Sequence, residues 1–167
     1  MKLRFIPVAG DDQETVERLS RLASQIVKEH YDPIIGPEQN DYMIEQYQSA
    51  SSLAAQIGRG CRYYRTEAGS EDAGFFAIEP REGGVLFLSK FYLRKEFRRK
   101  GIGRKQLEFI EARARELGRH TVRLTVNRKN LGSIEAYRHL GFHVAGEQAT
   151  DIGHGFVMDD YVMEKEV

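Results

Sequence analysis

The chain has 167 residues, and its 25 lysines and arginines balance its 25 aspartates and glutamates, giving a formal net charge of zero at pH 7. This length suits one folded domain, which we place at residues 1–167, because it is enough to bury most of an unfolded chain's surface in one core. With 41% hydrophobic residues to fill that core, disordered and fibrous proteins are excluded.

The sequence also bears on where the protein resides. The longest apolar run near the middle, Val85–Leu88, is far shorter than the roughly 20 residues that cross a bilayer, so we expect no membrane span. The first twenty residues are rich in charge, and we expect no secretory signal. A single cysteine, Cys61, cannot form an internal disulfide, which favours a cytoplasmic location.

The first third of the chain predicts one strand followed by helices. The strand covers Leu3–Val8, and Asp11 or Asp12 can cap the helix that begins after it. We expect this helix to end near Tyr31–Pro33, because the residue before a proline disfavours helical geometry. The weak helical pattern of residues 38–57 predicts two short helices.

Three strands are expected next, at Cys61–Thr66, Gly74–Ile78 and Val85–Leu93. Glycine-rich turn signals separate them, which favours consecutive antiparallel hairpins. The third strand is nearly continuous in apolar residues, as is typical of a central strand covered on both faces.

The second half of the chain predicts two helices and three strands. An apolar stripe marks a helix over about Ile102–Leu117, and alternating apolar and polar residues over 121–126 predict a strand. Asn130 can cap a short helix after this strand. Two closing strands follow, at Phe142–Ala149 and Phe156–Met163.

This order of elements predicts an α/β (α+β) fold, in which helices cover both faces of a single sheet of about seven strands. We expect Phe156–Met163 to lie at an edge of the sheet. Its free backbone groups could then pair with a second copy of the chain in a homodimer.

The zero net charge hides an uneven distribution. Residues 94–105 contain seven basic residues and one acidic residue, a net charge of +6, which leaves −6 for the rest of the chain. Within this segment, Arg98–Arg104 joins the apolar strand to the long helix and contains two glycines. Glycines allow close approach of the backbone, the first helical N–H groups have no partners, and the helix dipole adds positive charge. The loop therefore predicts a phosphate-binding site, although a solvated basic loop would have the same composition.

Other ligands of basic loops can be compared with this pattern. The P-loop motif is absent, and Gln106 stands where the dinucleotide fingerprint needs its third glycine. A nucleic-acid binder would use the same positive charge, but no recognition motif or aromatic platform accompanies the loop. We therefore expect no nucleic-acid partner.

Two segments resemble signatures of the GCN5-related N-acetyltransferase superfamily. The first is similar to the acetyl-CoA signature in having the spacing Arg98-x-x-Gly101-x-Gly103 after a strand that ends in Phe91-Tyr92-Leu93. The second resembles the superfamily's second motif, with serine where alanine is commoner, and it contains Leu124, Val126, Asn130, Ser133, Ile134, Tyr137, Gly141 and Phe142.

The resemblance extends over essentially the whole chain, because the order of elements also agrees. It implies a mixed, mostly antiparallel sheet. The C-terminal segment Asp151–Lys165 is further similar to a bacterial polyamine-acetyltransferase-like branch of the superfamily.

The resemblance implies acetyl-CoA as the cosubstrate and no metal. It places the pyrophosphate on the backbone of the loop, the pantetheine arm along the main chain at the end of the fourth strand, and Tyr137 at the thioester sulfur. The residues that it assigns to cofactor binding are Phe91, Leu93, Arg98, Arg99, Lys100, Gly101, Ile102, Gly103, Arg104, Asn130, Ser133 and Tyr137.

The implied reaction is direct transfer of an acetyl group to a primary amine. An alkylammonium has a pKa near 10.4, so a group must take its proton before or during attack. The strand Val85–Leu93 contains no carboxylate, which leaves the base unassigned among water, Glu29, His30 and Asp159.

Two donors complete the implied catalytic group, the Leu93 N–H for the oxyanion and Tyr137 for the leaving sulfur. A phenol of pKa near 10 gives its proton to a thiolate of pKa about 8.5 at a cost of about 2 kcal/mol. We therefore expect Tyr137 chiefly to hydrogen-bond the sulfur.

The acceptor is expected to be a small-molecule amine, either a polyamine or an amino-acid-like molecule. Residues 38–57 are expected to wall its pocket, and His30 and Tyr31, at the end of the first helix, are candidates to touch it. The acidic side chains that could attract a polycation are Glu38, Asp41, Glu45 and Asp159 or Asp160.

Alternatives to this assignment stay open. The acceptor could be a protein N-terminus or a lysine, or the chain could be a non-catalytic acyl-CoA-binding sensor. A metal site is not expected, because Gly141 breaks the helix between His139 and His143, the one pair of histidines with metal-like spacing.

Overall fold

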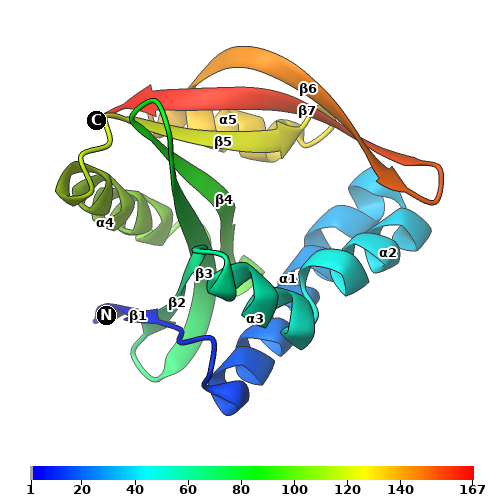
Figure 1. Ribbon diagram of the computed structural model, residues 1–167, viewed down its shortest axis with the longest axis horizontal. Coiled ribbons are helices and arrows are strands. Elements are labelled where there is room, and N and C mark those ends of the chain that lie inside the picture. Colours follow the sequence, from blue (N-terminus) through cyan, green and yellow to red (C-terminus); the bar gives the residue numbers. More distant parts are fainter. Residues whose placement is uncertain (1) are drawn as a thin grey trace.

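A computed structural model describes residues 2–167, and one seven-stranded sheet runs through it in the order β1-β2-β3-β4-β5-β7-β6 (Figure 1). The strands are β1 (Leu3–Pro7), β2 (Arg62–Ala68), β3 (Glu71–Arg81), β4 (Val85–Leu93), β5 (Thr121–Asn127), β6 (His143–Gly153) and β7 (Phe156–Glu166). The helices are α1 (Gln13–Ile35), α2 (Pro37–Tyr47), α3 (Ala50–Gly58), α4 (Ile102–Glu116) and α5 (Leu131–His139), with a short 3-10 helix, η1 (Lys95–Phe97), before α4.

The pairing of the strands confirms the predicted mixed, mostly antiparallel sheet. β4 and β5 are parallel, and the other five neighbouring pairs are antiparallel. β2, β3 and β4 form the predicted consecutive hairpins. Figure 1 shows that the strands before and after the β4–β5 junction run in clearly different directions, so the sheet is strongly twisted.

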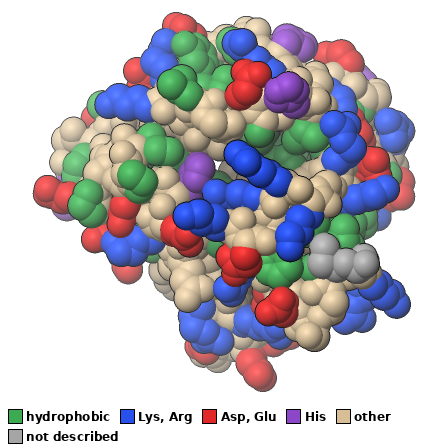
Figure 2. Space-filling model, turned by 180° about the vertical axis from the view of Figure 1, so that it is seen from behind, with side chains coloured by type: hydrophobic (Ala, Val, Ile, Leu, Met, Phe, Trp, Pro, Cys, Tyr) green, Lys and Arg blue, Asp and Glu red, His purple; other side chains and the backbone are tan. Residues whose placement is uncertain are grey.

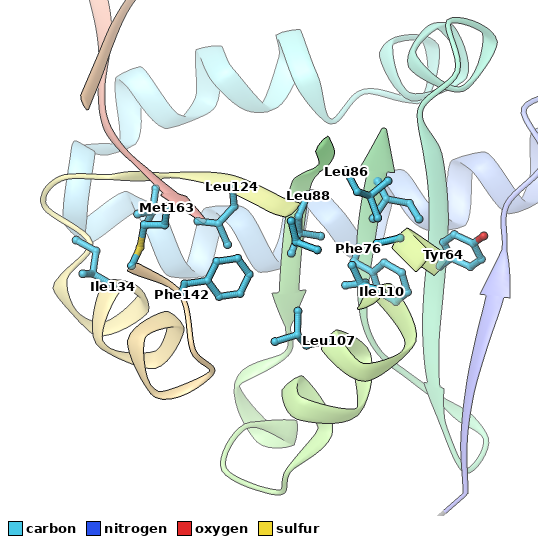
Figure 3. Packing of buried hydrophobic residues seen from close by; sticks show 14 residues of the cluster. Tyr64, Phe76, Leu86, Leu88, Leu107, Ile110, Leu124, Ile134, Phe142 and Met163 are labelled. Atoms are coloured by element: carbon cyan, nitrogen blue, oxygen red, sulfur yellow. The ribbon is translucent and has the colours of Figure 1, made fainter. Parts of the chain in front are cut away.

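Helices cover both faces of this sheet, α1 and α3 on one and α4 and α5 on the other. Neighbouring side chains of a strand point to opposite faces. Phe75 of β3 therefore packs with Leu19 of α1 and Leu53 of α3, whereas Phe76 packs with Ile110 of α4. Figure 3 shows the second cluster, in which side chains from α4, α5 and the sheet meet between the helices and the strands. Its labelled members are Tyr64, Phe76, Leu86, Leu88, Leu107, Ile110, Leu124, Ile134, Phe142 and Met163.

Helix caps agree with the sequence in two places. The Asp12 side chain accepts a bond from Thr15 N at 3.2 Å and so caps α1. The Asn130 side chain accepts a bond from Ser133 N at 3.3 Å and caps α5. No helix among residues 2–167 is long and apolar enough to cross a membrane.

The predicted end of the first helix near Tyr31–Pro33 is wrong. α1 continues through Pro33 to Ile35. Pro33 lies in the last turn, where its missing N–H removes a single helical bond, and the helix closes when Gly36 N–H donates to the Asp32 carbonyl at 3.0 Å.

The predicted edge position of Phe156–Met163 is also wrong. β7 lies between β5 and β6, with bonds on both sides, and β6 is the outermost strand. A homodimer formed by strand pairing at this end of the sheet would use β6, and it stays a prediction.

Candidate functional site

β4 and β5 pair over three residues and then separate. Val85–Phe87 lies opposite Thr121–Arg123, and within residues 2–167 no further pair joins the two strands. The rest of β4 keeps its bonds to β3, and the rest of β5 keeps its bonds to β7. The sheet therefore opens between the carboxyl ends of β4 and β5, the place where open α/β sheets bind ligands.

Ser89 is an extra residue in β4. Ala77 of β3 pairs with Lys90 and Ile78 pairs with Leu88, so Ser89 has no partner and forms a β-bulge. A bulge interrupts the alternation of side chains. Ser89 and Lys90 consequently line the same cavity on the α2–α3 side of the sheet.

Gly74 of β3 allows the close contact with the end of β4 that this path requires. A Cβ at Gly74 would lie 2.2 Å from the Tyr92 carbonyl oxygen and 3.0 Å from Leu93 Cα. The chain therefore has room only for glycine at this position.

Leu93 turns its backbone into the opening. Its carbonyl oxygen accepts bonds from the Arg98 guanidinium, at 3.2 Å from Nε and 3.1 Å from Nη2. The next N–H, that of Arg94, instead bonds to the Ala73 carbonyl on the β3 side, at 2.7 Å. Because the N–H and C=O of one strand residue point to the same edge, the N–H groups of Leu93 and Phe91 face the opening.

The loop before α4 presents unpaired N–H groups. Gly101 is the N-cap with φ 78°, a left-handed geometry that favours glycine, and it offers no side-chain cap. The first helical bond runs from Lys105 N to the Gly101 carbonyl, so the N–H groups of Ile102, Gly103 and Arg104 point out of the helix start.

Gly103 has no such backbone reason to be glycine. Its φ is not positive, and the nearest atom to an added Cβ is Leu93 Cδ1 at 3.9 Å. Space for an anion against the helix start accounts for a glycine here.

Basic side chains surround this helix start. Arg98, Arg99, Lys100 and Arg104 are exposed, and none forms an ion pair with a carboxylate in the described chain. Seen from behind Figure 1, Lys and Arg side chains gather around a hollow near the centre of the molecule (Figure 2). The loop thus has both the N–H groups and the free positive charge that a phosphate group needs.

A cavity of about 410 Å³, here called the loop cavity, brings together most of the residues predicted to bind the cofactor or the acceptor. Those that line it are His30, Phe91, Leu93, Arg98, Arg99, Gly101, Ile102, Gly103, Ser133 and Tyr137. Tyr31, Lys100, Arg104 and Asn130 do not line it.

Tyr137 lies against the end of β4. Its ring stacks on Phe91, with 6.0 Å between centroids and 13° between planes, and also contacts Phe142 at 6.0 Å. Burial raises the pKa of the Tyr137 hydroxyl well above its usual range. The hydroxyl is therefore a hydrogen-bond donor that holds its proton.

Asn130 joins α5 to the end of α1. Its Nδ2 donates to the Tyr31 hydroxyl at 3.1 Å, and its Oδ1 lies 3.3 Å from His30 Nε2. The side chain is 2% exposed. A direct bond from Asn130 to a ligand would have to replace one of these contacts, so its cofactor role stays a prediction.

His30 is half-buried, and its Nε2 also lies 3.5 Å from Ser133 Oγ. Burial and, secondarily, the charge of Arg98 lower the pKa of His30. The imidazole is thus neutral at pH 7. Tyr31 packs edge-to-face against both His30 and Tyr92.

Tyr31 and Tyr92 also line a smaller cavity of about 110 Å³, here called the inner cavity. Asp160 of β7 lines it with 4% of its surface exposed and forms no ion pair in the described chain. Burial, with the charge of Asp159, raises the pKa of Asp160 to about 6. The fully buried Asn40 lines the same cavity, and its Oδ1 has no hydrogen-bond partner in residues 2–167. A carboxylate and a free amide oxygen suit a cationic or donor group.

The largest cavity, here called the outer cavity, has a volume of about 880 Å³ and lies on the α2–α3 side of the opening. Residues of α2 and α3 line it, together with the β6–β7 hairpin and the bulged part of β4. That part of 38–57 walls the acceptor's pocket stays a prediction. Tyr92 lines the loop, inner and outer cavities alike. Tyr92 therefore forms a wall that the three cavities share beside the opening of the sheet.

Three residues that converge here, Asn40, Lys90 and Tyr92, were not expected from the sequence, which also did not separate Asp160 from Asp159. Asp159, proposed among the bases, is exposed and paired with Arg128 at 3.2 Å, because alternate strand residues face opposite sides. The alternation of side chains along the strand could have identified Asp160, because it follows Asp159 and therefore faces the other side of the sheet. Of the expected acidic residues, Asp41 is instead bonded to Lys28 at 2.7 Å, outside all three cavities.

Several solved structures have this fold. The PaiA N-acetyltransferase from Thermoplasma acidophilum, solved in complex with coenzyme A, has 26% identity over 100% of both chains and a TM-score of 0.80. An acetyltransferase from Thermus thermophilus has 17% identity over 100% of this chain and 98% of the other, with a TM-score of 0.71. A Bacillus subtilis acetyltransferase in complex with CoA has 15% identity over 99% of each chain and a TM-score of 0.64.

The sequence was also compared with family models and curated proteins. No curated protein matches it. The model of the acetyltransferase (GNAT) family matches residues 24–142, a region that runs from α1 through the basic loop before α4 and past the end of α5. The chain therefore belongs to the acetyltransferase (GNAT) family.

Proposed function

We propose that the protein transfers an acetyl group from acetyl-CoA directly to a primary amine of a small molecule. The observation that carries the proposal is the position of Tyr92, which lines all three cavities. A donor in the loop cavity and an amine in the inner cavity would meet at the opening of the sheet. Family membership and the coenzyme A in the related PaiA structure support acetyl-CoA as the donor.

The loop cavity suits this donor in two ways. The N–H groups of Ile102, Gly103 and Arg104 and the nearby basic side chains would bind its pyrophosphate. The backbone of Phe91 and Leu93, free on the opening side, would bond the pantetheine arm as an added strand would. Bound acetyl-CoA supplies an activated thioester for attack by the amine.

Asp160 is the proposed proton acceptor. The ammonium first releases one proton to water, because only the neutral amine can attack. The amine nitrogen then bonds to the acetyl carbon, the C–S bond breaks to give the CoA thiolate, and a second proton leaves the nitrogen. A carboxylate with a pKa of about 6 is a weaker base than a free alkylamine, so Asp160 takes the proton as the new C–N bond makes the nitrogen acidic. Before that step, its negative charge and Asn40 Oδ1 hold the amine in the inner cavity.

Two hydrogen-bond donors act on the thioester. The Leu93 N–H faces the opening and would donate to the acetyl oxygen as negative charge develops there. The Tyr137 hydroxyl would donate to the sulfur, in agreement with a raised pKa that disfavours full proton transfer. His30 and Tyr31 stay candidates for substrate contact, and their bonds to Asn130 indicate a positioning role.

The volume of the outer cavity supports a small-molecule acceptor over a protein, because sites for such ligands have volumes of roughly 300–1,000 Å³. The test is to mix the protein with acetyl-CoA and a panel of amines and to measure free CoA and N-acetylated product. Stoichiometric CoA and product from at least one small amine is the expected result. Tight binding of acetyl-CoA with no product from any amine would instead favour a non-catalytic sensor.

A further inference from the structure

The charges that line the outer cavity are predominantly positive. Its basic residues are Arg59, Arg81, Lys90 and Arg123, and its acidic residues are Glu79 and Glu164. Both acids are already paired, Glu79 with Arg81 at 3.2 Å and Glu164 with Arg123 at 2.7 Å. The cavity therefore has two basic side chains, Arg59 and Lys90, without an acidic partner in the described chain.

Lys90 is the more enclosed of the two. Its Nζ donates to the Tyr47 carbonyl at 2.8 Å, to Gln48 Oε1 at 3.0 Å and to Gln56 Oε1 at 3.3 Å. All three acceptors are neutral. The side chain is half-buried, whereas Arg59 is exposed. These three bonds use all three N–H donors of the ammonium. An anionic ligand in the cavity would therefore bind by replacing one of the neutral acceptors, and it would give this enclosed charge a counter-ion.

The bulge in β4 directs Lys90 to this cavity. In a regular strand, Lys90 would point to the same side of the sheet as Leu88, which packs in the cluster with α4 and α5. The bulge instead points the Lys90 side chain into the outer cavity. Lys90 directly precedes Phe91, which lines the loop cavity, and lies two residues before Tyr92, which lines all three cavities.

The acidic residues that would attract a polycation lie elsewhere. Glu38, Asp41 and Glu45 line none of the loop, inner and outer cavities, and Asp159 is bonded to Arg128. Asp160 is the one of the expected acids that lines a cavity of the site, and it does so in the small inner cavity. Of the two cavities on the acceptor side, the inner cavity thus has the unpaired negative charge and the outer cavity has the unpaired positive charge.

We propose that the acceptor is an amine that also carries an anionic group, a carboxylate or a phosphate, bound by Lys90 in the outer cavity while the amine lies beside Asp160 in the inner cavity. This inference rests on the proposed function. It assigns Lys90 as a specificity-determining residue and selects amino-acid-like acceptors over polyamines. Burial lowers the pKa of Lys90 to about 7, and a bound anion would favour its charged form.

The test compares acceptors that differ in one charge. Wild-type protein is assayed with L-amino acids and their amides, with phosphoethanolamine and ethanolamine, and with spermidine, by release of CoA. For the best acid, we expect kcat/KM at least about tenfold above that of its neutral partner, as for loss of one charge-assisted hydrogen bond. The carboxylate raises the pKa of the neighbouring amine and leaves less of it free, so amine basicity opposes the expected preference.

Variants of Lys90 connect the preference to this side chain. Lys90→Met should raise KM for the anionic acceptor at least about tenfold and change kcat/KM for its neutral partner less than about threefold, and Lys90→Arg should restore part of the loss. If Lys90 only stabilised the end of α2 through its bonds to Tyr47 and Gln48, Lys90→Met would change kcat/KM for both acceptors equally. Lys2→Met is the matched control, because Lys2 is exposed and lines none of the three cavities.

The outcomes separate the two proposals. If spermidine or the neutral amines react as well as the acids, or if Lys90→Met lowers both members of a pair equally, this inference is wrong and the proposed function stands. If no amine of any charge is acetylated, the proposed function is wrong, and this inference, which rests on it, is wrong as well. Preference for phosphoethanolamine over every amino acid would identify phosphate as the anionic group.

Discussion

The ring of Tyr137 lies nearly parallel to the ring of Phe91, with 6.0 Å between their centroids and 13° between their planes. Phe91 follows directly on the bulged part of β4, and its backbone faces the opening between β4 and β5. The contact therefore fixes the Tyr137 ring at the strand end along which the pantetheine arm is proposed to bind.

Tyr137→Phe should keep this stacking and remove only the hydroxyl. We expect kcat/KM to fall about 10- to 100-fold, the effect of losing one hydrogen bond to a group that becomes charged. The Kd of acetyl-CoA should change little, because the ring and the loop are intact. Tyr161→Phe is the control, since Tyr161 lines none of the three cavities. Full activity of Tyr137→Phe would refute the role of the hydroxyl.

Asp160→Asn should lower kcat at least about 100-fold, as expected when a group that accepts a proton in the transition state is lost. The neighbouring Asp159→Asn is the matched control, because Asp159 is exposed and paired with Arg128. If the two variants have the same activity, Asp160 is not the proton acceptor.

Asp160→Asn should also be more stable than wild type at pH 7. The pKa of Asp160 is higher in the folded chain, about 6, than its ordinary value of 3.8, so the folded chain binds the proton more tightly. Stability therefore falls as pH rises from 3.8 to about 6, and the full loss, about 3 kcal/mol, persists above that range. Urea unfolding at pH 7 should show Asp160→Asn above wild type by up to this amount. A destabilised variant would indicate that the carboxylate holds the fold together.

Activity should also depend on pH through Asp160. As pH falls through about 6 the carboxylate takes up a proton and loses its capacity as a base, so kcat/KM should fall. Tyr31 and Tyr92, which share the inner cavity with Asp160, have pKa values raised above 10 and stay neutral over this range. His30, whose pKa is lowered, and Lys90, whose pKa is about 7, also titrate close to this range, so the profile from pH 5 to 8 is compared with that of Asp160→Asn. A fall near pH 6 that persists in Asp160→Asn would contradict the assignment.

Gly103→Ala should stabilise the fold and weaken the binding of acetyl-CoA. Alanine fits the space at this position and favours helix, so the free energy of unfolding should rise by up to about 1 kcal/mol. The added Cβ lies where the phosphate is proposed to approach, and the Kd of acetyl-CoA should increase at least about tenfold. Gly58→Ala in α3 is the control for the helical effect alone, because a Cβ added at Gly58 has no atom within 4 Å. Unchanged affinity in Gly103→Ala would place the phosphates elsewhere.

Much of the fold could be predicted because its signals are local. Asp12 and Asn130 cap helices through bonds to residues three positions away, and Gly101 supplies the left-handed geometry of the loop. The position of β7 between β5 and β6 could not be predicted in the same way. Either strand of the closing hairpin can pair with β5, and long-range packing decides which one does.

The acceptor side of the site was unpredictable for a related reason. Asn40, Lys90 and Asp160 come from α2, β4 and β7 and converge only in the folded chain. The bulge at Ser89 also shifts the alternation of β4, so a regular strand pattern would not place Lys90 and Ser89 on one face. The loop cavity was predictable because most of its residues come from two continuous motifs.

In the proposed reaction, the acetyl group passes directly between two ligands that are bound together at the opening of the sheet. Initial rates of CoA release, measured over a grid of acetyl-CoA and best-acceptor concentrations, test it most directly. Direct transfer predicts intersecting double-reciprocal lines and an N-acetylated product equal in amount to the CoA released. Parallel lines, the pattern of an acetylated-enzyme intermediate, would contradict it.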